Sequence, residues 1–154
     1  GSGFKGTMKA FDSSRPSVAA MALGIGRAAY EYSRDWAMSE LPMSASFPRK
    51  AAIEQKLGTM KRELDAARGL VWQAAWMADN KIPNSKEASM SKAYAPQAGL
   101  RACIGAIQIM GPEGYSKEHL VEKWFRDIKV YDIFEGTGQI QRVVISRKIL
   151  GRLD

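Results

Sequence analysis

The stretch from Ile53 to Ala78, IEQKLGTMKRELDAARGLVWQAAWMA, carries the clearest structural pattern in the chain. Its apolar residues recur at alternating steps of four and three, at Ile53, Leu57, Met60, Leu64, Ala67, Val71, Ala74 and Ala78. Because an α-helix turns once in about 3.6 residues, this spacing gathers the apolar side chains into one stripe. The stretch therefore predicts a long amphipathic helix, and the segment 80–84 predicts the turn that ends it.

The same periodicity occurs upstream. Apolar residues follow steps of four and three at Val18, Ala22, Ile25, Ala29, Tyr32 and Trp36. Ser13 or Ser14 is expected to cap the start of this helix, and Pro16 suits a first turn because the N–H that it lacks is not needed there. Residues 1–12 are then expected to be a linker, followed by a helical domain over 13–154.

Downstream, the segment 86–110 is apolar on more than one side, which is typical of a central helix. Pro96 lies inside it and predicts a kink or a break. A shorter helix is expected over 117–126, and a last helix over 137–150. The pattern contains no alternating strand, so it predicts an all-α fold: an up-down bundle of four main helices plus a short extra helix.

Composition limits the classes of function. The 154 residues carry a net charge of +7, but the basic residues are scattered, so we expect solvated helix surface and no nucleic-acid partner. No apolar run is long enough for a membrane span. Cys103 is the only cysteine and His119 the only histidine, so we expect a reducing compartment, a buried thiol and no metal site. The four tryptophans are expected to pack in the core or between subunits.

One segment carries chemistry: Arg126-Asp-Ile-Lys-Val-Tyr-Asp-Ile-Phe-Glu-Gly-Thr-Gly-Gln-Ile-Gln-Arg142. Glu135 precedes the flexible Gly136, and Thr137 is placed to cap the helix that follows. The free N–H groups at the start of that helix attract anions and polarise carbonyl oxygens. Glu135 is therefore a candidate general base beside an electrophilic site, although a glutamate at a helix start also serves simply as capping chemistry.

The whole segment resembles the acyl-CoA dehydrogenase signature, in which Arg-Asp-x-Lys-x-x-x-Ile-Tyr-Glu-Gly-Thr leads into Gln-Ile-Gln-Arg. Further stretches resemble the same family in order and spacing, over nearly all of residues 3–150: Gly3-Phe4-Lys5 with Phe11-Asp12-x-x-Arg15-Pro16, Ser91–Ala95, and Gln108–Tyr115. The resemblance implies the family's C-terminal helical domain, with residues 1–12 as the linker from an upstream β-domain. Two preceding domains would complete the enzyme, and this domain in isolation is expected to be inactive.

The resemblance also implies roles for single residues. Glu135 matches the catalytic base, which takes the α-proton of an acyl-CoA thioester while the β-hydrogen leaves as hydride to FAD. Three residues match family positions that contact the substrate: Asp12, Arg15 and Gly136. Three others match positions that contact FAD: Thr137, Gly138 and Gln139. Gln108 and Gly111 match positions that contact the FAD of a neighbouring subunit. For Asp12 and Arg15, a local ion pair at a helix start is the alternative.

The chain departs from the family after its first long helix. The family's Arg-x-Thr-Phe-Gly stretch aligns with Glu40, Pro42, Met43 and Ser44, and its His-Gln pair with Lys50-Ala51. These positions do not supply the expected inter-subunit FAD contacts, so either a homotetramer or a hetero-tetramer is compatible with the sequence. The implied electron acceptor is an electron-transferring flavoprotein, and the implied compartment is the bacterial cytoplasm or the mitochondrial matrix. An acyl-CoA oxidase relative, a non-catalytic assembly module and a nucleic-acid-binding protein are the alternatives.

Overall fold

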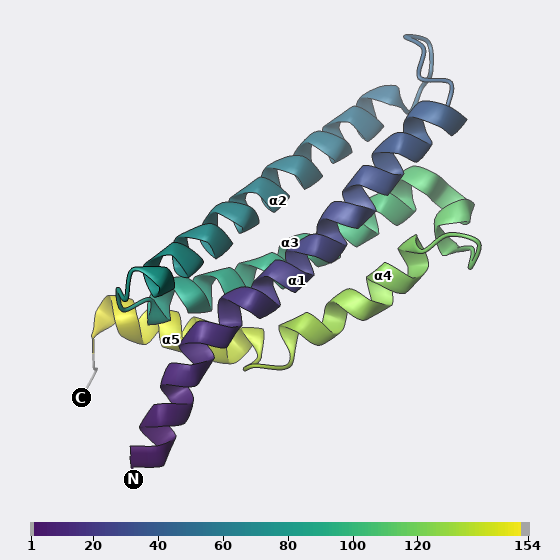
Figure 1. Ribbon diagram of the computed structural model, residues 1–154. Coiled ribbons are helices and arrows are strands. Elements are labelled where there is room, and N and C mark those ends of the chain that lie inside the picture. The colour runs from purple at the N-terminus through teal and green to yellow at the C-terminus, as the bar shows by residue number, and fades with distance from the viewer. Residues whose placement is uncertain (1, 152–154) are drawn as a thin grey trace.

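The computed structural model describes residues 2–151, which form helices joined by turns and loops, with no strand in that range. Three long helices, α1 (Ser2–Glu40), α2 (Lys50–Asp79) and α3 (Ser85–Met110), lie side by side (Figure 1). The 3₁₀ turn η1 (Gly111–Tyr115) leads to α4 (Val121–Asp127), and η2 (Ile128–Asp132) continues α4 along the bundle. The last helix, α5 (Gly138–Leu150), lies at the end of the bundle where α3 begins. The predicted all-α bundle of four main helices and a short extra one is confirmed.

Helix α3 is the centre of the bundle, as its broad apolar surface predicts. It packs against α1, α2, α4 and α5 and against both 3₁₀ turns. Its crossing with α1 is close because small residues meet there: a Cβ added at Gly26 would lie 2.8 Å from Gly99 Cα. The helix continues through Pro96, which is fully buried, so of the predicted kink or break the break does not occur.

The start of α1 differs from the expectation. The helix begins at Ser2 and not at Ser13 or Ser14, and Pro16 lies inside it. Proline removes one N–H donor, and the hydroxyl of Ser14 does not cap a new helix because it bonds to the carbonyl of Phe11 at 3.4 Å and to Glu135. Residues 2–12 are therefore helical, and their first turns extend beyond the bundle (Figure 1). Their role as a linker between domains stays a prediction.

The tryptophans divide into two pairs. Trp36 and Trp124 pack against the core, as predicted. Trp72 and Trp76 on α2 are 68% and 60% exposed, so a place in the core is wrong for these two, and packing between subunits stays a prediction for them. Among the described residues, no helix is both long and apolar enough to cross a membrane.

Candidate active site

Glu135 lies on a left-handed turn between η2 and α5. Its φ is 58°, and the φ of Gly136 is 93°, values that favour glycine because a Cβ crowds the backbone there. Thr137 then caps α5, with its Oγ1 accepting a hydrogen bond from the Ile140 N–H at 3.5 Å, which confirms the predicted cap. A non-glycine residue in this conformation costs free energy and persists only where its surroundings hold it, as commonly happens at functional sites.

The Glu135 carboxylate points back to the bundle. The side chain is half-buried, and its Oε2 accepts a hydrogen bond of 2.7 Å from Ser14 Oγ on α1. The turn supplies the carboxylate, and a helix from the other end of the chain fixes its position. Glu135 is therefore an anchored acid and not a freely solvated one.

Two fully buried polar side chains converge on the carbonyl oxygen of Gly136. Lys92 Nζ, from α3, donates to it at 3.1 Å, and Gln141 Nε2, from α5, donates to it at 2.9 Å. The same amide nitrogen of Gln141 lies 3.3 Å from the Glu135 carbonyl oxygen. The backbone of the turn is thus tied to both helices that flank it.

Lys92 brings a positive charge into this interior position. Burial lowers the pKa of Lys92 below its usual value, and the nearby charge of Arg15 lowers it further. The negative charges of Asp132 and Glu135 oppose this change and favour the ammonium form. The site therefore holds two cations and two carboxylates close together, at the edge of the core.

Asp12 and Arg15 form the local ion pair that was the alternative to a substrate contact. Arg15 Nη1 lies 3.1 Å from Asp12 Oδ1 and also donates to Ser89 Oγ at 3.3 Å. Arg15 is 4% exposed, whereas the Asp12 side chain is 25% exposed. The structure thus brings Arg15 to the Glu135 site, and contact with a substrate stays a prediction for both residues.

The first group of predicted FAD residues lies at the start of α5, next to Glu135. Thr137, Gly138 and Gln139 present the first-turn N–H groups of a 13-residue helix, which suit phosphate or carbonyl oxygens. Gly138 is buried, and a Cβ there would lie 2.6 Å from Asp132 Oδ1. Asp132 Oδ1 and Gln141 Oε1 are buried acceptors without a partner among the described residues. This mixture of donors and acceptors fits FAD, which carries phosphates, carbonyls, hydroxyls and an N–H.

The second group of predicted FAD residues, Gln108 and Gly111, lies at the opposite end of α3. The rise of an α-helix puts Gln108 about 24 Å along the axis from Lys92, so one chain does not bring the two groups together. This separation agrees with the implied contacts to two different FAD molecules. Gly111 has a φ of 69° and open space around its Cα.

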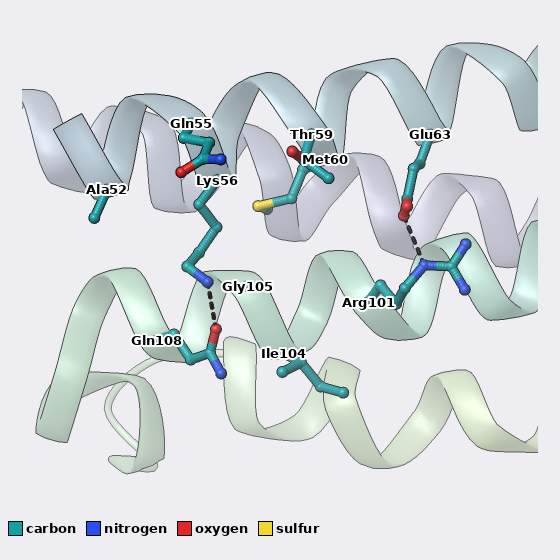
Figure 2. A pocket seen from close by; sticks show the side chains of 10 residues that line it. All are labelled: Ala52, Gln55, Lys56, Thr59, Met60, Glu63, Arg101, Ile104, Gly105 and Gln108. Carbon is teal, nitrogen blue, oxygen red and sulfur yellow. Dashed lines mark hydrogen bonds and ion pairs between the residues drawn. The ribbon is translucent and has the colours of Figure 1, made fainter.

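Gln108 lines a groove of about 360 Å³ between α2 and α3 (Figure 2). Its Oε1 accepts a hydrogen bond of 2.6 Å from Lys56 Nζ, and Arg49 Nη2 donates to the carbonyls of Gln108 and Ile109, both at 3.2 Å. Two cations, Lys56 and Arg49, therefore bond to the end of α3 that carries Gln108. Neither residue stands out from the sequence alone.

The lesser candidates have local roles. His119 Nδ1 and the Tyr32 hydroxyl share a hydrogen bond of 2.7 Å, and His119 Nε2 lies 3.4 Å from a carboxylate oxygen of Glu113. Within residues 2–151, no three His, Cys, Asp or Glu side chains form a cluster that could hold a metal ion. Cys103 is buried as predicted, and burial raises the pKa of its thiol to about 12.

Comparison with known proteins decides the family. The family model "Acyl-CoA dehydrogenase, C-terminal domain" matches residues 1–150. The chain belongs to the acyl-CoA dehydrogenase family. This finding confirms the resemblance that the segment 126–142 carries.

Acyl-CoA dehydrogenases from several bacteria are similar over almost the whole chain. This chain is 43% identical to "Probable acyl-CoA dehydrogenase YngJ" of Bacillus subtilis, over 96% of this chain and 39% of that protein. The butyryl-CoA dehydrogenase structure from Megasphaera elsdenii superposes with a TM-score of 0.92 and 35% identity. A chain in the structure of the electron transferring flavoprotein of Acidaminococcus fermentans superposes with a TM-score of 0.91 and 32% sequence identity. Each of these two comparisons covers 97% of this chain and 39% of the other, so the chain spans about two fifths of its relatives.

The sites predicted for this acyl-CoA dehydrogenase domain do not include Lys92 or Gln141. Both lie inside stretches that carry the family resemblance. A signal for Lys92 exists in the sequence, because its phase on α3 coincides with the buried Ala88, Ala95 and Gly99. A lysine on the apolar face of a helix is rarely buried unless its charge is paired. Nothing in the sequence indicates that Lys92 and Gln141 bind the same carbonyl.

Proposed function

We propose that this chain supplies the catalytic base of an FAD-dependent acyl-CoA dehydrogenase, together with part of the FAD site and of the subunit interface. The observation that carries the proposal is the half-buried Glu135 carboxylate, fixed by Ser14 beside the N-terminus of α5. Membership of the family supports it.

In this proposal Glu135 acts on the carbon next to the thioester. Its carboxylate takes the α-proton, and the electrons of the broken C–H bond form the Cα–Cβ double bond as the β-hydrogen departs. The backbone N–H of Glu135 polarises the thioester oxygen and stabilises the charge that develops there. Bound FAD supplies the acceptor for the β-hydrogen as hydride. Gly136 leaves space for the substrate, and Asp12 and Arg15 contribute to binding its CoA part.

The FAD is held by residues of two chains. Thr137, Gly138 and Gln139 would bind it in the same subunit, and Gln108 and Gly111 would bind it in a neighbour. The distance between the two groups along α3 supports this division. We therefore also propose a tetramer, of identical or unlike subunits, with an electron-transferring flavoprotein as the electron acceptor. In isolation the domain is inactive, because the rest of the acyl-CoA site and of the FAD site lies in the upstream part that its relatives possess.

The test requires the chain joined to the upstream domains of its family. Acyl-CoA is added anaerobically, and bleaching of the flavin absorbance is followed in the parent protein and in Glu135→Gln. Removal of a positioned general base lowers rates about 10²- to 10⁴-fold, so bleaching in Glu135→Gln should fall by at least a hundredfold. Glu54→Gln, on the exposed face of α2, is the matched control and should bleach normally. Normal bleaching in Glu135→Gln would remove Glu135 as the base, and a wild-type protein that never bleaches would favour the non-catalytic assembly module.

A further inference from the structure

The conformation of the Glu135 turn depends on side chains from outside the turn. Two consecutive residues have positive φ, and one of them is not glycine. A short loop of this kind does not keep such a conformation without tertiary contacts. The relevant contacts converge on a single atom, the Gly136 carbonyl oxygen, which accepts hydrogen bonds from Lys92 and Gln141.

Packing alone does not explain why a charged lysine stands at position 92. The side chains of Lys92 and Gln141 are both fully buried, and a buried ammonium group loses its hydration. Burial is indeed the largest cause that lowers the pKa of Lys92. An apolar side chain of similar size would fill the same space in α3 without that cost. The charge at this position therefore needs a reason other than packing.

The geometry of Gln141 supports the same reading. A Cβ added at Gly136 would lie 2.7 Å from Gln141 Nε2, so the amide is packed directly against the turn. Lys92 approaches the same carbonyl from α3, and Gln141 approaches it from α5. Rotation of the Gly136-Thr137 peptide, which carries this carbonyl, would break both hydrogen bonds and would disturb the turn that presents the carboxylate to Ser14.

We infer that Lys92 and Gln141 are positioning residues, which clamp the Gly136 carbonyl and thereby hold the Glu135 carboxylate in its reactive orientation. This inference rests on the proposed role of Glu135 as the base. Neither side chain acts on the substrate itself. Their loss should slow the transfer of the α-proton while leaving acyl-CoA binding nearly unchanged.

The experiment uses the flavin-loaded full-length enzyme and the variants Lys92→Met and Gln141→Leu. The rate constant of flavin reduction is measured at rising acyl-CoA concentration, with ordinary and with α-deuterated acyl-CoA. In Lys92→Met the flavin should be reduced at least tenfold more slowly than in the parent enzyme. The half-saturating acyl-CoA concentration should stay within threefold of the parent value, and the α-deuterium isotope effect should be at least as large as in the parent. Gln141→Leu should show a loss of the same kind, because either substitution leaves the Gly136 carbonyl with one of its two donors.

Two controls separate positioning from general damage. Leu64→Ala opens a cavity in the core of α2 far from the turn, and should lower the melting temperature while keeping the reduction rate within twofold. Hydrogen exchange gives a readout other than activity: amides of the segment 133–141 should exchange faster in Lys92→Met, and amides of α2 should not. If Lys92→Met does not yield a folded flavoprotein, Gln141→Asn, which shortens the donor in place, decides by the same criteria.

The inference fails if both variants reduce within twofold of the parent, if the loss lies only in the half-saturating concentration, or if Leu64→Ala slows reduction equally. Glu135→Gln in the same assay distinguishes the two hypotheses. If it abolishes reduction while Lys92→Met does not, only the positioning role is wrong. If it reduces normally, the proposed function is wrong whatever Lys92 does.

Discussion

The hydroxyl of Ser14 and the carboxylate of Glu135 lie 2.7 Å apart, although 121 residues separate them in sequence. The contact joins α1 to the turn before α5 and thus closes the bundle at the end where α5 lies. Hydrogen bonds of this kind connect the order of a site to the stability of the fold.

Replacing Ser14 with alanine should therefore weaken the fold. A hydrogen bond to a charged group contributes about 1.5–3 kcal/mol when buried, and partial exposure of this pair reduces that to about 1 kcal/mol. Urea denaturation of Ser14→Ala should show this loss. Ser17→Ala, an exposed serine on the same helix, is the matched control and should change the free energy of unfolding by less than about 0.5 kcal/mol.

Gly136 and Gly24 should respond oppositely to alanine. Gly136 has a φ of 93°, and its new Cβ would meet Gln141 Nε2 at 2.7 Å, so Gly136→Ala should destabilise by about 1–3 kcal/mol. Gly24 is exposed within α1 with open space around it, so Gly24→Ala should stabilise by about 0.5–1 kcal/mol. Equal effects of the two substitutions in guanidinium titrations would contradict the assigned backbone of the turn.

Lys92→Met tests what the buried ammonium does to stability. Because burial lowers the pKa of Lys92 in the fold, the charged form is disfavoured there relative to the unfolded chain. This penalty is present at neutral pH and is relieved as the pH rises toward 10.5, the usual lysine value. At pH 7, Lys92→Met should lose no more than about 1 kcal/mol, since Gln141 still satisfies the Gly136 carbonyl. A loss of several kcal/mol would mean that the charge supports the fold itself.

Cys103 makes stability depend on alkaline pH in the opposite direction. Its pKa rises from 9.0 to about 12 on folding, so the folded chain keeps a proton that the unfolded chain loses above pH 9. The contribution is complete below pH 9 and is lost as the pH rises toward 12, by about 1 kcal/mol at pH 10. The difference between wild type and Cys103→Ala should shrink over this range. The thiol should also react slowly with Ellman's reagent until denaturant is added, and rapid labelling of the native chain would contradict its burial.

The bundle was predictable because helical phase is a local property of the sequence. The expected ranges 86–110 and 137–150 differ by one residue from the starts of α3 and α5, and the cap at Thr137 is where it was expected. The predicted start of α1 was wrong. Ser13, Ser14 and Pro16 together form a local signal for a helix start, but in the fold the Ser14 hydroxyl bonds to Glu135 and does not cap a helix. Trp72 and Trp76 lie at helical spacing too, but helical spacing alone does not distinguish a buried face from an exposed one, and both are exposed.

The candidate site was predictable only as a list of residues. The segment around Glu135 gives the chemistry, because a carboxylate precedes a capped helix. The contacts that fix it come from α1 and α3, and no rule of spacing links Ser14 or Lys92 to Glu135. Asp12 and Arg15 show the same limit, since the sequence allowed both a local ion pair and a ligand contact, and only the structure shows the pair.

The close crossing of α1 and α3 at Gly26 and Gly99 has a consequence for evolution and engineering. Gly26 lies about 18 Å along α1 from Ser14 at 1.5 Å per residue, and its lack of a Cβ lets α1 approach α3 closely. A larger side chain at either glycine would push apart α1, whose Ser14 bonds to the Glu135 carboxylate, and α3, whose Lys92 bonds to the Gly136 carbonyl. Two glycines remote from the Glu135 turn thus limit how far apart its two supporting helices lie.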